Sequence, residues 1–249
     1  MIPKDHPRYH SLIRREKIAE GAREGIVAME GVSAHGRGEA FDYLLGEKTT
    51  DSAELAERVS AAYLKTARHP VISVNGNTAA LASAEIAALQ KASGAFVEVN
   101  LFHRTEVRMR KISALLNKNG VDLLTGKTER LLPLSHDRAL CLKDGIFKSD
   151  VVLVPLEDGD RCRALREMGK TVITIDLNPL SRTARTADVT IVDELTRALP
   201  NITRFCGEIG EISEITNAEC DEQIRSYDNK SILRSALDEM KMRLNGALD

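Results

Sequence analysis

Tryptophan is absent from this 249-residue sequence, and aromatic residues make up only 4% of it. The core of such a chain must be aliphatic, because aromatic side chains are too few to fill it. Apolar runs are also short, and VVLVPL at 151–156 is among the longest. A transmembrane helix needs about 20 mostly apolar residues, so we expect no membrane span.

The sequence lacks two arrangements that often carry function, namely paired cysteines and blocks of basic residues. The four cysteines form no CxxC pair, so we expect buried, reduced thiols rather than a disulfide framework or a metal site. The formal net charge is −2, and no block of lysine and arginine offers a footprint for nucleic acid. The first residues, MIPKDHPRYH, lack the apolar stretch of a secretory signal. These absences predict a soluble, cytoplasmic protein with no nucleic-acid or membrane partner.

What the sequence does contain is an alternation of short apolar runs with helix-like segments. The runs are rich in valine and isoleucine without polar alternation, which is typical of strands buried on both faces of a parallel sheet. We therefore predict an α/β fold, with a Rossmann-like, mostly parallel sheet flanked by helices and extra N- and C-terminal helices. One domain is expected over 1–249, with helical parts at 1–69 and about 205–249 around a core at about 70–200. The predicted strands are PVISVN, FVEVN, VDLL, VVLVPLE, TVITIDLNP and DVTIVDE.

Polar side chains follow most of these predicted strands at their carboxyl ends. In an open parallel sheet the ligand crevice lies outside those ends, so the pattern predicts a crevice lined by asparagine and acidic residues. For one strand alone, a turn or N-cap role is the better interpretation. Across five strands a ligand crevice is at least as well supported. The residues are Asn75, Asn77, Asn100, Glu157, Asp158, Asp176, Asn178, Asp193 and Glu194.

The segment VNGNTAALASAEIAAL, from Val74 onward, joins a strand to a helix through a glycine-containing turn. Free N–H groups at the start of that helix suit an anion, and an N-cap role for Thr78 is about equally well supported. The dinucleotide fingerprint GxGxxG is missing, which argues against a Rossmann oxidoreductase. LTGKT at 124–128 ends like a Walker A loop, but the first glycine of that loop would fall on Val121, so we reject a P-loop.

Basic residues gather after the second predicted strand, in NLFHRTEVRMRKI at 100–112. Arg104 and Arg108 are four positions apart and are expected to share a helix face. Their planar guanidinium groups suit the capture of phosphate or carboxylate, and a solvated basic face is the alternative. The nearby SHDR offers His136 and Arg138, although a solvated loop is the better-supported interpretation there.

The segment DLNPLSRTARTADVT at 176–190 follows a predicted buried strand. An acid at such a strand end, here Asp176, commonly binds a ribose hydroxyl in Rossmann-like folds. The Asn178–Pro179 pair favours an extended or turn geometry, so the loop is expected to be shaped. Arg182 then lies within reach of a phosphate. These residues make the best case for nucleotide binding.

The segment SAHGRGEAF at 33–41 sets His35, Arg37 and Glu39 among glycines. It is open to three interpretations: a turn, a structural salt bridge, or a grip on an anionic ligand. To act on a ligand it must fold back over the crevice, or reach the crevice of a neighbouring subunit. The glycines would then let the backbone approach a phosphate closely.

Five blocks of the sequence together resemble the archaeal 4-phosphopantoate–β-alanine ligases, also called phosphopantothenate synthetases. They are IPKDHPRYHSLIRREK, AHGRGEAFDYLLGE, VNGNTAAL, VLVPLEDGDR and ITIDLNPLSRTA, and the resemblance extends from Ile2 to about Arg204. It implies an ATP-dependent ligation of 4-phosphopantoate and β-alanine to 4′-phosphopantothenate, with AMP and diphosphate released, in coenzyme A biosynthesis. An acyl-adenylate, Mg²⁺ and a homodimer are also implied. The implied ATP contacts are Arg15 (or its neighbour Arg14), Arg37, Asp176, Leu177, Asn178, Arg182, Thr183, Glu194 and Leu195.

Adenylation brings several negative charges together, and preorganised cations must offset them. We therefore expect Arg37 and Arg104 to act in catalysis, and Arg182 to contact ATP phosphates with Arg37. The ligands of Mg²⁺ stay open, as does any base for the amine. Candidate substrate contacts are Arg104, Arg108 and His136 for the phosphate or carboxylate of phosphopantoate, and Asn75 and Asn77 for its hydroxyl and carbonyl groups. The alternative function is a non-catalytic nucleotide-binding sensor.

Overall fold

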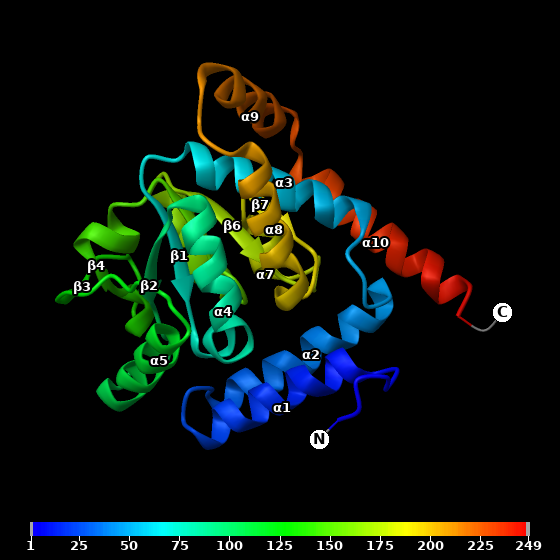
Figure 1. Ribbon diagram of the computed structural model, residues 1–249, viewed down its shortest axis with the longest axis horizontal. Coiled ribbons are helices and arrows are strands. Elements are labelled where there is room, and N and C mark those ends of the chain that lie inside the picture. Colours follow the sequence, from blue (N-terminus) through cyan, green and yellow to red (C-terminus); the bar gives the residue numbers. More distant parts are fainter. Residues whose placement is uncertain (1, 248–249) are drawn as a thin grey trace.

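The computed structural model describes residues 2–247 and is built on a five-stranded parallel sheet (Figure 1). The strand order is β2-β1-β5-β6-β7, and each neighbouring pair is parallel. The predicted α/β class with a parallel sheet is therefore confirmed. A second, antiparallel sheet joins β3 to β4. The strands are β1 (Pro70–Val74), β2 (Phe96–Val99), β3 (Thr128–Arg130), β4 (Leu140–Leu142), β5 (Val151–Leu153), β6 (Thr171–Ile175) and β7 (Val189–Ile191).

The order of the strands reverses next to β1. The chain enters the sheet there, adds β2 on one side and then crosses to the other side with β5. The register places Ile72 of β1 beside Val97 of β2 and Leu153 of β5. In open α/β sheets the ligand crevice lies at the carboxyl ends of the strands around such a switch point. The residues that follow β1 and β5 are thus in the position that this topology reserves for a ligand.

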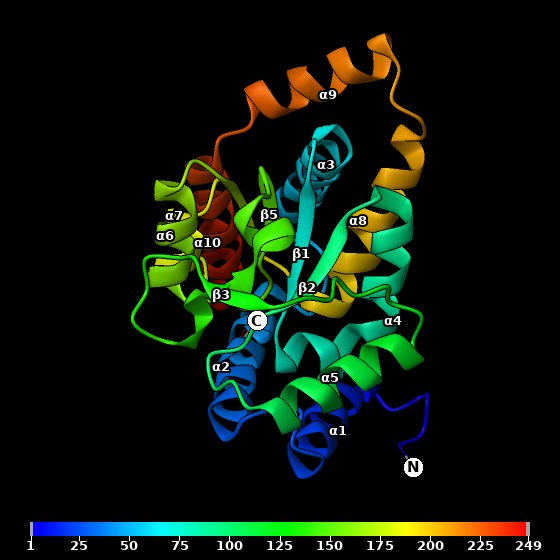
Figure 2. The ribbon, with the colours of Figure 1, turned by 90° about the vertical axis from the view of Figure 1, so that its left-hand side faces the viewer.

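Helices cover both faces of the sheet. In Figure 2, α6, α7 and α10 lie on one side of the strands, while α3, α4 and α8 lie on the other. The extra N- and C-terminal helices are confirmed as well. The helices are α1 (Tyr9–Arg23), α2 (Met29–Leu45), α3 (Asp51–Thr66), α4 (Gly76–Ser93), α5 (Glu106–Lys118), α6 (Gly159–Glu167), α7 (Arg182–Thr186), α8 (Leu195–Ile209), α9 (Glu214–Ser226) and α10 (Asn229–Asn245).

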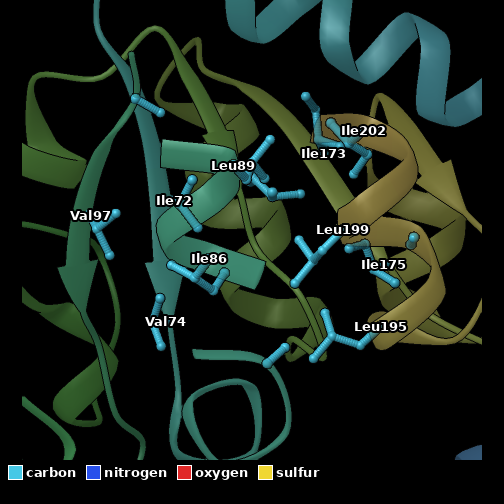
Figure 3. Packing of buried hydrophobic residues seen from close by; sticks show 14 of the residues in the cluster. Ile72, Val74, Ile86, Leu89, Val97, Ile173, Ile175, Leu195, Leu199 and Ile202 are labelled. Atoms are coloured by element: carbon cyan, nitrogen blue, oxygen red, sulfur yellow. The ribbon is translucent and has the colours of Figure 1, made fainter. Parts of the chain in front are cut away.

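The core between the sheet and its helices is aliphatic, as the composition predicts. Ile72 and Val74 of β1 pack with Ile86 and Leu89 of α4 and with Leu199 of α8, and all five side chains are fully buried (Figure 3). Burying each such side chain contributes about 1.5–3 kcal/mol. This packing fixes the angle at which α4 and α8 begin at the carboxyl edge of the sheet.

The first two helices lie side by side below the carboxyl ends of the strands (Figure 1). Lys17 of α1 donates to the carbonyl oxygen of Leu81 in α4 at 2.7 Å. Asn77 at the start of α4 donates to the carbonyl oxygen of Gly31 in α2 at 2.8 Å. These bonds hold the N-terminal helices against the edge at which the polar strand ends gather. Within residues 2–247, no helix has both the length and the apolar character that a membrane crossing requires.

One local prediction is wrong, and one of the alternatives left open is excluded. VDLL at 121–124 is not a strand, because only Leu123 forms a bridge with Val97 before the chain leaves the edge of the sheet. The segment at 33–41 is not a turn but lies inside α2. Each interior glycine costs that helix about 1 kcal/mol relative to alanine. Packing of α2 against α1, α4 and α10 overrides this local preference.

Candidate active site

A cleft of about 720 Å³ runs along the carboxyl edge of the sheet, with α2 forming one wall. Each strand of the parallel sheet contributes residues from just beyond its end: Asn75 after β1, Leu101 after β2, Glu157 after β5, Asp176 after β6 and Asp193 after β7. The cleft therefore coincides with the ligand crevice that the sequence predicts.

Most of the predicted site residues line this cleft. They come from α2, from the start of α4, from α5 and from the segments that follow β6 and β7, so the fold gathers residues that are far apart in the sequence. They are Arg37, Asn75, Asn77, Arg108, Asp176, Leu177, Asn178, Thr183, Glu194 and Leu195.

Two predicted ATP contacts, Arg15 and Arg182, do not line the cleft. The Nε atom of Arg15 donates to both carboxylate oxygens of Glu39, at 2.9 and 2.8 Å, and its side chain is 45% exposed. Arg182 is the exposed first residue of α7. Arg14, the alternative to Arg15, is buried and does line the cleft.

Two predicted substrate contacts, Arg104 and His136, also lie outside the lining. Arg104 donates to the hydroxyl of Thr128 at 3.3 Å and borders a separate hollow. It precedes α5, which begins at Glu106, so the expectation that it shares a helix face with Arg108 is wrong. The Nε2 atom of His136 lies 3.0 Å from Oδ2 of Asp160.

The wall opposite α2 carries a loop whose shape is set by its own hydrogen bonds. Asp176 accepts a bond from the backbone N–H of Asn178 at 2.9 Å and another from the hydroxyl of Ser181. Ser181 in turn accepts from the N–H of Ala184 and caps α7. Thr183 donates to the carbonyl oxygen of Glu157 at 2.7 Å, which ties this loop to the end of β5. The loop is therefore preorganised.

Arg37 and Asp176 act on each other across the cleft. Burial raises the pKa of Asp176, while the Ser181 and Asn178 hydrogen bonds and the charge of Arg37 lower it. The Arg37 side chain makes no ion pair or hydrogen bond within the described residues, so its guanidinium donors remain available to a ligand. Gly38 faces the Leu177 side chain, which would lie 3.6 Å from a β-carbon added there.

The end of β7 is fixed by a buried ionic network that joins α1, α2 and α8. Arg197 of α8 donates to Asp42 and to Asp193, each at 2.5 Å. Arg14 donates to Asp42 at 3.0 Å and lies 3.7 Å from Glu194. Burial raises the pKa of Glu194, and the charge of Arg14 lowers it. The network holds three cleft carboxylates in place.

The other end of the cleft lies at the start of α4. Asn75, not Thr78, caps this helix: its Oδ1 accepts from the N–H of Thr78 at 3.0 Å, and its Nδ2 donates to the carbonyl oxygens of Pro155 and Leu156 at 3.0 and 3.1 Å. Asn75 therefore joins the ends of β1 and β5. Leu156 has a φ of 53°, a left-handed conformation that side chains other than glycine seldom adopt.

Comparison with known proteins supports the resemblance noted in the sequence. Residues 52–243 match the phosphopantothenate/pantothenate synthetase family. The chain belongs to this family. Three 4-phosphopantoate–β-alanine ligases are among its relatives. That of Methanospirillum hungatei JF-1 is 58% identical over 100% of both chains. That of Methanosarcina mazei is 53% identical over 98% of this chain and 95% of its own, and that of Thermococcus kodakarensis 50% over 98% and 93%.

The cleft also contains an arginine, Arg138, for which the sequence favoured a solvated loop. Arg138 is only 6% exposed and lines the cleft, so that interpretation is wrong. Its Nη1 atom donates to Glu157 and to the carbonyl oxygen of Asn100, both at 3.2 Å. Arg138 directly precedes the apolar run ALCL, whose burial in and around β4 draws the arginine inward. This apolar run is the sequence signal from which the burial of Arg138 could have been predicted.

Phe102 and His35 also line the cleft, and of these only Phe102 was not a candidate from the sequence. Phe102, which is 42% exposed, stacks on His136 with ring centroids 4.7 Å apart. His35 of α2 has a buried Nε2 atom without a hydrogen-bond partner among the described residues. Burial lowers the pKa of His35, which favours a neutral imidazole. The spacing of residues in the sequence did not distinguish Phe102 from a surface residue.

The described residues contain no group of three or more His, Cys, Asp or Glu side chains that would hold a metal ion. Mg²⁺ in nucleotide sites, however, usually binds one or two carboxylates and the substrate phosphates. Asp158 provides one such group: it lines the cleft, its carboxylate lies 3.5 Å from the Arg138 guanidinium, and about half of its side chain is exposed. One carboxylate in the lining is compatible with a magnesium ion held jointly by a nucleotide's phosphates.

Proposed function

We propose that this chain is an ATP-dependent ligase that condenses 4-phosphopantoate with β-alanine to 4′-phosphopantothenate, in coenzyme A biosynthesis. The observation that carries this proposal is that relatives 50–58% identical over at least 98% of the chain are named for this activity. In the first step, the carboxylate of the acid attacks the α-phosphate of ATP, giving an acyl-adenylate and diphosphate. The amine of β-alanine then attacks the acyl carbon, loses a proton and displaces AMP.

The charges of the cleft suit this chemistry. ATP and a phosphorylated acid both carry several negative charges, and the reaction requires them to approach closely. Arg37, Arg108 and Arg138 line the cleft from three different segments, and Arg108 and Arg138 are held by hydrogen bonds before any ligand arrives. Preorganised cations of this kind stabilise developing charge without reorganising at the moment of reaction.

We assign ATP to the half of the cleft between α2 and the ends of β6 and β7. Support comes from the preorganised loop at Asp176 and from the unpaired guanidinium of Arg37. Arg15 and Arg182 stay in the proposal as outer contacts, because both are exposed. Arg15 must then leave its ion pair with Glu39. The proposed ATP residues are Arg15, Arg37, Asp176, Leu177, Asn178, Arg182, Thr183, Glu194 and Leu195.

The acid is assigned to the half of the cleft around Asn75, Asn77 and Arg108. Asn75 and Asn77 make hydrogen bonds to the backbone, so they shape this half as well as line it. Arg104 and His136 lie just outside, and a role for either requires its side chain to turn toward the cleft. The catalytic role of Arg104 alongside Arg37 remains part of the proposal.

Magnesium, subunit state and location complete the proposal. Mg²⁺ bound by Asp158 and ATP phosphates would neutralise charge on the diphosphate leaving group. The resemblance to the archaeal ligases supports a homodimer in the cytoplasm that takes small-molecule substrates, with neither nucleic acid nor membrane as a partner.

Product analysis tests the proposed reaction. Purified protein is incubated with ATP and Mg²⁺ together with 4-phosphopantoate, β-alanine or both, and nucleotides are separated. We expect AMP and diphosphate whose formation depends on 4-phosphopantoate, and 4′-phosphopantothenate only when β-alanine is present. ADP as the sole nucleotide product would contradict the adenylate route. ATP binding without turnover in every mixture would instead make the chain a nucleotide sensor.

Removing the Arg37 side chain should slow the adenylation step without unfolding the protein. Because Arg37 makes no internal ion pair, Arg37→Ala is expected to keep the unfolding midpoint and to lower kcat by about 10²–10³-fold. Arg185→Ala, an exposed arginine on α7 outside the cleft, is the matched control and should retain wild-type turnover. Full activity of Arg37→Ala would remove Arg37 from the catalytic machinery.

A further inference from the structure

His35 lies at the boundary between the two proposed halves of the cleft. Its helix, α2, contacts the acid half at Gly31, whose carbonyl oxygen accepts from Asn77 at 2.8 Å. The same helix contacts the ATP half at Gly38, where a β-carbon would lie 3.6 Å from the Leu177 side chain. Gly31, His35 and Gly38 follow one another at helical spacing, so they share one face of α2. With a rise of about 1.5 Å per residue, His35 lies within about 6 Å of both contacts along the helix axis.

The imidazole of His35 has no internal partner. It lines the cleft, and neither ring nitrogen makes a hydrogen bond within residues 2–247. Nε2 is buried and Nδ1 is not, so Nδ1 is the nitrogen that a ligand can reach. Burial lowers the pKa of His35, Glu39 on the next turn of α2 raises it, and the charges of Arg14 and Arg15 on α1 lower it. These are the charged groups that act on the ring, and together with burial they favour a neutral imidazole.

The buried carboxylates that line the same cleft already have internal partners. Each accepts a hydrogen bond from an arginine or a hydroxyl group, and protonating one would weaken a bond that shapes the cleft. They are Glu39, Asp42, Glu157, Asp176, Asp193 and Glu194. Glu30, His103 and Asp158 also line the cleft, but their side chains are 73, 53 and 48% exposed. Among the described residues, His35 is thus the half-buried base of the lining that has no internal partner.

The second step of the proposed reaction needs such a base. The amine of β-alanine is an ammonium ion at neutral pH, since aliphatic amines titrate at about pH 10. An ammonium nitrogen has no lone pair with which to attack an acyl carbon. The arginines that line the cleft disfavour a further cation and so lower the pKa of a bound ammonium. A general base works best when its own pKa lies near the operating pH, which is the range of an imidazole.

Building on the proposed function, we propose that Nδ1 of His35 is the general base that deprotonates β-alanine. An N–H bond of the ammonium breaks, its proton moves to Nδ1, and the freed lone pair attacks the acyl carbon of the adenylate. As the C–N bond forms, the C–O bond to AMP breaks, and its electron pair leaves with AMP. The second proton of the nitrogen passes to water. The charge of Glu39 stabilises the imidazolium that forms.

The test separates the two steps on one preparation of each protein. No proton moves when the carboxylate of the acid attacks ATP, so adenylation does not need His35. Exchange of labelled diphosphate into ATP in the presence of 4-phosphopantoate measures that first step. Formation of 4′-phosphopantothenate with β-alanine measures the whole reaction. We expect His35→Gln to keep the exchange near the wild-type rate and to lower kcat with β-alanine by about 10²–10⁴-fold.

Hydroxylamine and pH distinguish a base from a residue that only packs. Hydroxylamine is largely unprotonated at neutral pH, so it attacks an acyl-adenylate without first losing a proton. Hydroxamate formation by His35→Gln should therefore stay near the wild-type rate. Raising the pH supplies free amine, so kcat of the variant with β-alanine should rise by about tenfold per pH unit, while that of the wild type levels off above the pKa of His35.

His10→Gln is the matched control, because His10 is exposed on α1 and lies outside the cleft lining. Its ratio of ligation to exchange should equal that of the wild type. This ratio does not depend on the fraction of folded protein, and His35→Ala provides it if His35→Gln does not fold. Equal losses of exchange, hydroxamate formation and ligation in the His35 variants, or full ligation in them, would overturn the inference. Absence of exchange in the wild-type protein would instead defeat the proposed function.

Discussion

At the scale of single residues, Glu57 is the most unusual group outside the cleft. It lies in α3, is fully buried, and its carboxylate oxygens have no hydrogen-bond partner among the described residues. Burial and the charge of Asp193 raise its pKa from 4.5 to about 9, while Asn201 and Arg204 partly offset this. The folded protein therefore holds a neutral carboxylic acid at neutral pH.

Glu57 should make the protein less stable as pH rises. Between pH 4.5 and about 9 the folded state binds a proton at Glu57 that the unfolded state releases, so stability is greatest below this window and falls through it. Glu57→Gln removes this dependence. We expect its unfolding free energy, relative to wild type, to rise with pH by up to about 1.4 kcal/mol per unit.

Urea denaturation at several pH values between 5 and 9 measures this difference. Glu222→Gln is the matched control, because Glu222 is exposed on α9 and is not among the charges that act on Glu57. Its curve should run parallel to that of the wild type. A parallel curve for Glu57→Gln would show that Glu57 is ionised in the folded protein.

At the scale of elements, one cation of α8 joins α2 to the end of β7. Arg197 of α8 bonds Asp42 of α2 and Asp193 beyond β7, and both carboxylates are buried. Removing one partner of a buried ionic network leaves charge uncompensated. The wall of the cleft therefore depends on a residue that does not line it.

Arg197→Ala should be strongly destabilising. Asp42 keeps Arg14, but Asp193 loses its ion pair, so we expect the unfolding free energy to fall by about 3 kcal/mol. Equilibrium urea unfolding measures the loss. Arg234→Ala, an exposed arginine on α10, should change it by less than about 0.5 kcal/mol. Similar losses in both variants would contradict a structural role for the network.

How far the elements could be predicted depended on what decides each one. The valine- and isoleucine-rich strands around Ile72 and Ile173 were predictable, because burial on both faces requires that composition. The helix around Arg37 was not predictable, because its glycines favour a turn and only packing against other helices overrides them. Leu123 shows the converse error: its apolar run resembles a strand but forms only one bridge, with Val97 of β2.

At the scale of the whole molecule, ligand binding should slow hydrogen exchange in α2 and leave it unchanged in α9. In Figure 2, α9 and α2 lie at opposite ends of the fold. ATP with Mg²⁺ at about 100 times its Kd stabilises the folded state by about 2.7 kcal/mol. We expect slower hydrogen exchange across α2 when ATP is bound and unchanged exchange in α9. Equal protection of both helices would place ATP elsewhere.

The site was predictable wherever it follows the topology of the sheet. Asn75, Asp176 and Glu194 lie where the carboxyl ends of parallel strands must meet, so the sequence order of strands located them. Arg138 was not predictable in this way, because it reaches the cleft from a segment between sheets. The rotation of α1 about its axis decides whether Arg14 or Arg15 faces the cleft.

Phe102 gives the protein a practical optical property. It borders the cleft, is partly exposed and stacks on His136, in a chain that contains no tryptophan. A single indole placed at this position would be the only tryptophan fluorophore in the molecule. Its emission would therefore report occupancy of the cleft without a contribution from any other tryptophan. Stopped-flow mixing with one substrate at a time would then show the order in which ATP and the acid bind.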